Sequence, residues 1–311
     1  MTDRDPPLPR PLITICACTY RRPKGLTALL RSCRALRTRP DFDLRFVVLD
    51  NDDTPSAREV VARETRDFPW PCRYLHAPEP GIPVVRNRAL EAAGETGFIV
   101  FVDDDETVTP DWLLALWDTQ RATGATFVQG PVRMLVHDAR DEWWLSTLFF
   151  RQRRFADRAK RQESWTNNVI VDLDFVARTG CRFEERLRYD GGTDTLFFQD
   201  IVRHGGRGAY AAEAWVCELQ PKSRLTWRWA VNRQFRYGAT RAMTVRLREP
   251  PGRAAAYCLL RGAGMAVVGT GLLASAALRG RVGIADGVAL WSRAAGIVSG
   301  MAGLRKLEYA R

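Results

Sequence analysis

A regular alternation of strand-like and helix-like segments over residues 12–135 most limits the folds open to this chain. Apolar runs predict strands at 12–18, 45–49, 72–75, 98–102 and 127–135. Apolar residues at helical spacing predict helices at 24–37, 55–66, 84–93 and 110–123. This order indicates a mostly parallel sheet with helices on both faces, in which ligands bind beyond the carboxyl ends of the strands.

The positive charge of the chain is concentrated at its C-terminal end. The 311 residues carry a net charge of +11, yet residues 222–311 hold 16 basic and 3 acidic residues, while residues 1–221 hold 31 and 33. A near-neutral body with a cationic end implies an anionic partner for that end. Nucleic acid, a membrane surface and an anionic lipid substrate all fit this charge distribution.

Other features of composition narrow the class of protein. Hydrophobic residues make up 46% of the chain, which excludes an intrinsically disordered protein. The seven cysteines form no CxxC pair, so a reduced, cytoplasmic compartment fits best. The polar, proline-rich residues 1–10 do not resemble a signal peptide and are expected to be disordered.

An acidic run follows the most apolar predicted strand. Asp103, Asp104, Asp105 and Glu106 come directly after the sequence FIVFV. Carboxylates at a strand end repel one another unless a cation neutralises them, and oxygen ligands suit Mg²⁺ or Mn²⁺, which can hold a diphosphate. The alternative is a solvated acidic turn.

A second acidic motif lies about 90 residues later, at Gly191-Gly192-Thr193-Asp194. A helix through the following residues would place Asp194 at or near its N-terminus. Alone, this pattern is an ordinary helix cap. It gains meaning only in combination with the acidic run.

The C-terminal third of the chain is less regular. We expect a strand at 166–171 and a helix at 225–237, followed by apolar stretches at 254–278 and 294–304 that basic residues interrupt. Spanning a bilayer takes about 20 apolar residues, so the first stretch is borderline, and helices lying in a membrane interface are favoured. The alternative is a buried helical hairpin.

Five short motifs in this order and spacing resemble family 2 glycosyltransferases of the GT-A fold, and bacterial exopolysaccharide glycosyltransferases of the succinoglycan-biosynthesis type most of all. The resemblance covers roughly residues 10–245. The motifs are Cys18-Thr19-Tyr20-Arg21-Arg22-Pro23, Leu49-Asp50-Asn51-Asp52, Arg86-Asn87-Arg88-Ala89-Leu90, Phe101-Val102-Asp103-Asp104-Asp105 and Gly191-Gly192-Thr193-Asp194.

The resemblance implies an α/β GT-A fold, Rossmann-like, and the pattern of the C-terminal sequence adds an apolar and basic helical appendage. Residues 11–249 would form the glycosyltransferase domain, with a nucleotide-sugar-binding half (11–135) and an acceptor half (136–249). Residues 250–311 would form helices that associate with an anionic membrane surface.

The resemblance also implies roles for individual residues. Asp194 would be the catalytic base, and Asp103 and Asp105 would bind Mn²⁺ or Mg²⁺. The nucleotide-sugar would contact Thr19, Tyr20, Asp50, Asp52, Arg86, Asp103, Asp104, Arg233 and Arg236. The acceptor would contact Trp165, Asn167, Asn168 and Thr193. From the residues alone, Asn167 and Asn168 could instead be structural. Arg233 and Arg236 could lie on a solvated helix face.

Three positions depart from the family pattern. Thr193 stands where the family has Glu, Leu196 where a second acidic residue is usual, and Tyr237 where a Trp follows the Arg of the (Gln/Arg)-x-x-Arg-Trp motif. The first puts the identity of the acceptor in doubt, and the first two together motivate the non-catalytic alternative given below. The third weakens any case for processive polymer synthesis.

The predicted activity is an inverting, metal-dependent transfer of a sugar, UDP-linked in our expectation, to a lipid-linked glycan at the cytoplasmic face of the bacterial inner membrane. One alternative is a non-catalytic relative that binds nucleotide-sugar or membrane. A nucleic-acid-binding protein is a weaker alternative because only the charge favours it. No GxGxxG turn follows the first strand, which disfavours a dinucleotide dehydrogenase.

Overall fold

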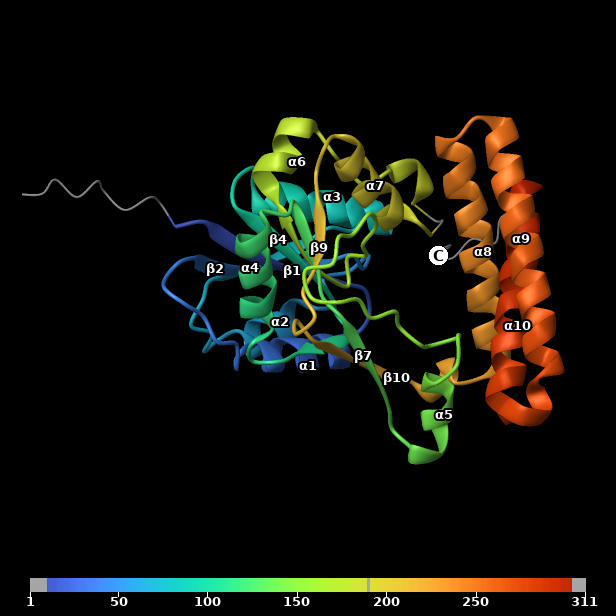
Figure 1. The fold of residues 1–311 in the computed structure, drawn as a ribbon. Coiled ribbons are helices and arrows are strands. Elements are labelled where there is room, and N and C mark those ends of the chain that lie inside the picture. The colour runs from blue at the N-terminus through green and yellow to red at the C-terminus, as the bar shows by residue number, and fades with distance from the viewer. Residues whose placement is uncertain (1–9, 189–190, 304–311) are drawn as a thin grey trace, which may run out of the picture.

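The computed structural model describes residues 10–188 and 191–303, where a mixed α/β domain stands beside three long helices (Figure 1). The larger sheet of this described part has the strand order β3-β2-β1-β4-β8-β6-β9. Its strands are β1 (Leu12–Thr19), β2 (Asp43–Asp50), β3 (Cys72–His76), β4 (Phe98–Asp103), β6 (Phe127–Gln129), β8 (Asn168–Asp172) and β9 (Gly208–Tyr210). Only β8 runs antiparallel to its neighbours, so the expected mostly parallel α/β fold is confirmed.

A smaller sheet and a set of helices complete the described structure. The smaller sheet has the order β5-β10-β7, from β5 (Glu106–Val108), β7 (Val132–Val136) and β10 (Val216–Gln220). The helices are α1 (Pro23–Cys33), α2 (Arg58–Glu64), α3 (Ile82–Ala93), α4 (Trp112–Thr123), α5 (Glu142–Leu145), α6 (Leu173–Thr179), α7 (Thr193–Arg203), α8 (Trp227–Arg248), α9 (Pro251–Ala274) and α10 (Ala276–Met301), with 3₁₀ turns at Ala139–Asp141, Glu185–Leu187 and Lys222–Arg224.

Hydrophobic layers cover both faces of the large sheet. Side chains of a strand alternate between faces, so Ile13 of β1 packs in a layer with Trp112 of α4. Cys16 of the same strand points to the opposite layer, which Phe197 of α7 helps to fill. The FIVFV strand lies in the middle of the sheet and is buried on both faces, as its continuous apolar sequence predicts.

The carboxyl ends of three parallel strands meet at one edge of the sheet. Thr19 at the end of β1 pairs in register with Asp50 of β2, and Cys18 pairs with Asp103 of β4. The chain turns to one side of β1 to form β2 and β3, and to the other side to form β4. This is the crevice where open α/β sheets bind their ligands.

The strand expected at 127–135 is wrong as one element. β6 ends at Gln129 in the large sheet, and β7 starts at Val132 in the small one. Between them, a Cβ on Gly130 would lie 2.4 Å from the carbonyl oxygen of Ala214. Pro131 has no N–H to continue the ladder, so the chain changes sheet at this Gly-Pro pair.

The helix expected at 225–237 is eleven residues too short, because α8 continues to Arg248. Its second half packs closely on α10 through glycines. A Cβ on Gly238 would lie 2.0 Å from the carbonyl oxygen of Arg293, and one on Gly296 would lie 1.9 Å from that of Phe235. Contact with α10 thus stabilises the part of α8 that its sequence pattern does not predict.

Helices α8, α9 and α10 form one group, which we call the helical unit (Trp227–Met301). It begins before residue 250, where the sequence places the start of the membrane helices, and the division at that point stays a prediction. The disordered segment expected at residues 1–10 lies, apart from Arg10, outside the described residues.

A methyl group at the α8–α10 contact should destabilise the protein. We expect Gly296→Ala to lower the free energy of unfolding by about 1–3 kcal/mol, because two helix backbones must move apart. Gly264→Ala is the matched control: it lies in α9 with open space around the new methyl group, and should stabilise by roughly 0.5–1 kcal/mol. Urea unfolding measured by circular dichroism tests this, and equal stability of the two variants would contradict the close contact.

Candidate active site

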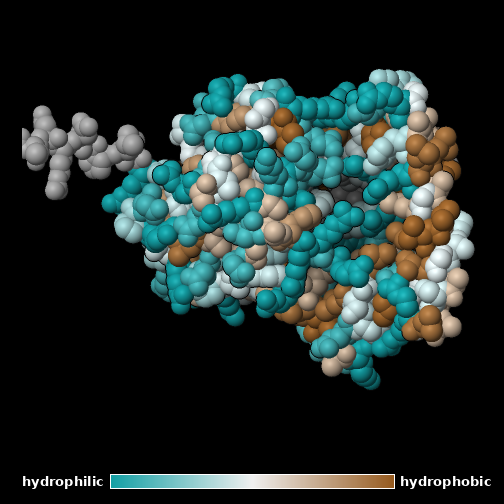
Figure 2. Space-filling view, viewed as in Figure 1, coloured by the Kyte–Doolittle hydropathy of each residue, from teal (hydrophilic) through white to brown (hydrophobic). Residues whose placement is uncertain are grey.

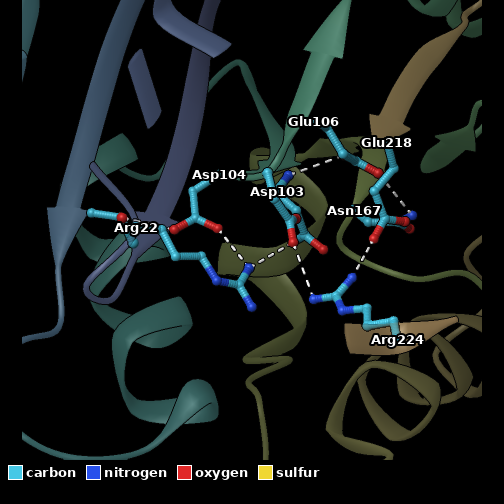
Figure 3. A network of polar contacts seen from close by, with 9 residues as sticks. Arg22, Asp103, Asp104, Glu106, Asn167, Glu218 and Arg224 are labelled. Carbon is cyan, nitrogen blue, oxygen red and sulfur yellow. Dashed lines mark hydrogen bonds and ion pairs between the residues drawn. The ribbon is translucent and has the colours of Figure 1, made fainter. Parts of the chain in front are cut away.

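Arginines from distant segments hold the acidic run at the end of β4 (Figure 3). The buried Asp104 accepts hydrogen bonds from the Thr19 hydroxyl at 2.7 Å and from Arg22 at 3.0 Å. Asp105 accepts from Arg22 at 2.8 Å and from Arg224 at 3.3 Å. The contacts join the ends of β1 and β4, the start of α1 and the segment after β10.

The first turn of α1 lies directly against this loop. A Cβ on Gly25 would lie 2.6 Å from the carbonyl oxygen of Asp104. Only glycine allows so close an approach of helix and loop, and the approach brings Arg22 within reach of both carboxylates.

Glu106 is buried on the other side of the run. One carboxylate oxygen accepts a hydrogen bond from the backbone N–H of Asp103 and the other from the side chain of Asn167, both at 3.2 Å. Burial and the nearby charges of Asp103 and Glu218 raise the pKa of Glu106 well above its ordinary value. Arg224 pairs with Glu218 at 2.7 Å and so brings a positive charge to this side.

Asp103 is the carboxylate of the run with the least compensation. Burial and the nearby charges of Asp105, Asp104 and Asp194 raise its pKa to about 7, against the opposing effect of Arg86. Within the described residues its side-chain oxygens accept no hydrogen bond. A cation would therefore find an available acceptor and an excess of negative charge at this side chain.

Asp194 lies in the first turn of α7, after Gly192, whose positive φ of 91° suits glycine. Its carboxylate forms an ion pair with Arg86 of α3 and accepts a hydrogen bond from the Thr166 hydroxyl at 3.3 Å. The next residue after Thr166, Asn167, donates to Glu106, so Asp194 lies close to the acidic run. The structure thus brings together two motifs about 90 residues apart in the sequence.

The predicted nucleotide contacts fall into two groups. Asp50 is fully buried and accepts hydrogen bonds from the N–H groups of Asp52 and Ala57 and from the hydroxyl of Tyr74. It therefore shapes the loop after β2 and is not available to a ligand. Asp52 is also buried, and its carboxylate pairs with the exposed Arg21 at 2.8 Å.

Tyr20 and Thr19 differ in the exposure of their side chains. Tyr20 is exposed and carries the Arg21 guanidinium 5.0 Å from its ring centre. Thr19 is buried, and its hydroxyl donates to Asp104. Of the two, only Tyr20 has a side chain open to a ligand.

The predicted acceptor contacts are also divided. Asn168 is fully buried, accepts from the indole N–H of Trp112 and donates to the carbonyls of Pro131 and Ala214, so it is not open to an acceptor. Trp165 is exposed just before Thr166. Asn167 lies beside the acidic run.

The remaining predicted positions lie on α7 and α8. The Thr193 hydroxyl is 3.4 Å from Asp194, and Leu196 is buried in the core, which accounts for an apolar residue at that position. Arg233 lies over Trp229 and donates to the hydroxyl of Tyr237 at 2.6 Å. Arg236 is half-buried on the same helix.

The sequence analysis missed four residues of this site as functional candidates. Arg22 lies inside a quoted motif, and Glu106 ends the acidic run, so a local signal existed for both. Thr166 and Arg224 reach the site only through the fold, since Arg224 is 119 residues from Asp105.

The described residues contain no group of three or more His, Cys, Asp or Glu side chains placed to hold a metal ion alone. Mg²⁺ is commonly held by one or two carboxylates together with substrate phosphates. Asp103 and Asp105, two residues apart, would suit that mode, with phosphate oxygens of a substrate completing the coordination.

The mostly parallel sheet, with an acidic loop at the carboxyl ends of its strands, has the fold of GT-A glycosyltransferases. The chain belongs to glycosyl transferase family 2, whose sequence model matches residues 14–180. The resemblance stated from the motifs is therefore confirmed.

Relatives support the same assignment. The chain is 35% identical over 300 residues to the succinoglycan biosynthesis protein ExoM of Rhizobium meliloti (strain 1021), covering 95% of this chain and 94% of ExoM.

Two solved structures share the fold. The mannosyltransferase PcManGT from Pyrobaculum calidifontis, in complex with GDP-Man and Mn²⁺, matches with a TM-score of 0.64 at 19% identity, covering 96% of this chain and 89% of that one. S. aureus TarS 1–349 matches with a TM-score of 0.52 at 15% identity, covering 94% and 91%.

The buried position of Asp50 leads to a prediction about stability. Asp50→Asn replaces one acceptor oxygen with an NH₂ group that faces a donor, and we expect a loss of about 1–3 kcal/mol in the free energy of unfolding. Asp53→Asn is the control in the same loop, since its side chain is 62% exposed and its ion pair with Arg21 is 3.5 Å long. Thermal and urea unfolding compare the two, and an unchanged midpoint for Asp50→Asn would mean that its hydrogen bonds contribute little.

Proposed function

We propose that this glycosyltransferase moves a sugar from a nucleotide-sugar, UDP-linked in our expectation, to a hydroxyl of a lipid-linked glycan, with inversion at the anomeric carbon. The observation that carries the proposal is the position of Asp194 beside the acidic run, where Thr166 contacts Asp194 and the next residue, Asn167, contacts Glu106. A base and a diphosphate-binding edge then face one site, as direct displacement requires.

The donor would lie along the carboxyl ends of β1, β2 and β4. Tyr20 and Asp52 would contact the nucleoside, while Arg22, Arg86 and Arg224 would add positive charge around the diphosphate. Positive groups that are already ordered stabilise the charge that develops on the leaving diphosphate. Asp103 and Asp105 would hold Mn²⁺ or Mg²⁺, and such an ion supplies further charge neutralisation when bound.

Asp194 would accept the proton of the acceptor hydroxyl as that oxygen attacks the anomeric carbon. The bond to the donor diphosphate breaks as the new glycosidic bond forms, so an α-linked donor gives a β-linked product. Arg86 and Thr166 fix the orientation of the Asp194 carboxylate before substrate binds. Trp165, exposed beside Thr166, offers an apolar surface for an acceptor sugar.

The relatives support particular parts of this proposal. ExoM is named for succinoglycan biosynthesis, which supports a role in the synthesis of a cell-surface polysaccharide. PcManGT was solved with GDP-Man and Mn²⁺, which supports a nucleotide-sugar donor and a divalent metal as a class.

The proposed base gives a direct test. We expect Asp194→Asn to lower sugar transfer by at least about 10²-fold, because proton transfer by a placed base contributes about 10²–10⁴-fold. Binding of the nucleotide-sugar in the presence of Mn²⁺ should survive, since Asp194 does not line the nucleoside pocket. A radiolabelled panel of nucleotide-sugars measures both.

Asp118→Asn is the control, because Asp118 is an exposed residue of α4 that pairs with Arg39. Transfer at the wild-type rate by Asp194→Asn would remove Asp194 as the base. Nucleotide-sugar binding by the wild type with neither transfer nor donor hydrolysis would favour the non-catalytic alternative.

The helical unit carries the apolar surface of the molecule. Among the described helices, α9 is long and apolar enough to cross a membrane by length and composition, with a mean hydropathy of 1.4 over its most apolar window. Brown patches over α9 and α10 mark this surface at the right of Figure 2. Large apolar side chains that are more than half exposed include Leu259, Leu260, Val267, Val268, Leu278 and Val298.

An exposed group of large apolar side chains next to basic residues is typical of proteins that lie in a membrane interface. Arg253, Arg261 and Arg279 lie on the same helices and suit an anionic surface. This supports a position of the helical unit at the cytoplasmic face of the inner membrane, where a lipid-linked acceptor would be available.

Point variants test the membrane contact better than truncation, because removing α10 would uncover the glycine contact of α8. The double variant Leu260→Gln, Val267→Gln should bind anionic vesicles roughly tenfold or more weakly, since burying each such side chain is worth about 1.5–3 kcal/mol. Leu135→Gln and Leu219→Gln, exposed on the small sheet, are the controls. Co-sedimentation measures the binding, and equal retention of all variants would rule out this surface.

A further inference from the structure

A cavity separate from the acidic run lies where α7, α8 and α9 meet. Its volume is about 460 Å³. Arginines from all three helices dominate its charged lining, which comprises Arg203, Arg241, Arg248, Arg253, Glu163 and Glu249. The proposed transfer mechanism uses none of these residues.

The acidic residues around the cavity do not balance all of its arginines. Arg241 pairs with Glu163 at 2.8 Å, and Arg253 lies 3.6 Å from Glu249. In the parts of the chain that the structure describes, Arg203 has no acidic partner. The charged groups around the cavity therefore have a net positive charge, which favours an anionic ligand.

Arg248 adds a buried donor without an acceptor. Its terminal nitrogen pairs with Asp200 of α7, while its Nε is buried and has no hydrogen-bond partner within the described structure. Buried polar groups in folded proteins are nearly always hydrogen-bonded, so this N–H indicates an acceptor that the described residues do not supply. Arginine forms strong, directional hydrogen bonds with phosphate oxygens.

One face of α9 leads from the cavity to the apolar surface. Arg253 and Tyr257 line the cavity, and Leu260 and Val267 follow on the same face at helical spacing. Leu260 is 77% exposed and Val267 is 72% exposed. A molecule with an anionic head in the cavity could therefore lay an apolar chain along this face.

Two segments connect the cavity with the proposed catalytic base. Gln199 and Arg203 lie five and nine residues after Asp194 on α7, which is about 8 and 14 Å along the helix at roughly 1.5 Å per residue. Glu163 lies three residues before Thr166, which contacts Asp194. The separation leaves room for a short saccharide between a head group in the cavity and Asp194.

We propose that this arginine-lined cavity binds the phosphate or diphosphate group of an amphiphilic ligand whose apolar chain lies along Leu260 and Val267. The inference rests on the proposed function, because such a ligand is the lipid-linked acceptor of the transfer. The cavity holds the head group, and the attached saccharide extends towards Asp194.

Binding of farnesyl diphosphate and of inorganic diphosphate to the full-length protein in detergent, measured by calorimetry with excess nucleotide-sugar present, tests the cavity. We expect Arg248→Gln and Arg203→Gln each to weaken farnesyl diphosphate binding at least tenfold. Arg203→Gln breaks no ion pair with a described residue, so it covers the case in which loss of the Asp200 contact unfolds Arg248→Gln. Arg228→Gln, an exposed arginine of α8 outside the cavity, is the control and should bind as the wild type does.

The source of the head group follows from the two ligands. Tighter binding of farnesyl diphosphate than of inorganic diphosphate, with the difference removed by Leu260→Gln, assigns the cavity to a lipid-linked group. Equal binding of both, lost in the cavity variants, assigns it to a free diphosphate. Wild-type affinity for both ligands in Arg203→Gln and Arg248→Gln overturns the proposal. If nucleotide-sugar itself does not bind, the proposed function fails, whatever the cavity variants do.

Discussion

Repulsion among the carboxylates at the end of β4 is the interaction on which the rest of the site depends. Three aspartates and a glutamate follow one another there, and burial strengthens the effect of each charge on its neighbours. The compensating arginines come from the start of α1, from α3 and from the segment after β10. The charged carboxylates at this strand end are therefore stabilised only once the sheet, the covering helices and the small second sheet have folded around them.

The arginines neutralise the carboxylates of the acidic run unequally, and this difference affects where a cation would bind. Asp104 and Asp105 are bonded to arginines, whereas the side-chain oxygens of Asp103 accept no hydrogen bond from the described residues. The site is thus ordered before any ligand arrives, yet one position within it still favours a cation. Such an arrangement requires little rearrangement when a charged substrate binds.

Much of the fold could be predicted from sequence because its strongest signals are local. The FIVFV strand, the acidic run after it and Asp194 at a helix start all depend on neighbouring residues. The break at Gly130-Pro131 and the length of α8 could not be predicted from the sequence. Each depends on a close contact with a distant segment. Polar residues at strand ends were ambiguous for a related reason: Asp50 and Asn168 point into the protein, and their residue types carry no sign of this.

The glycine contacts between α8 and α10 also govern the geometry of the whole molecule. Two helices in backbone contact cannot slide or bend past each other easily, and α8 touches the turn before α7 through Gly192. If α9 and α10 rest on a bilayer, Asp194 would stand at one set height above the lipid headgroups. The enzyme would then select its acceptor by length, because only a glycan whose end reaches that height would meet Asp194.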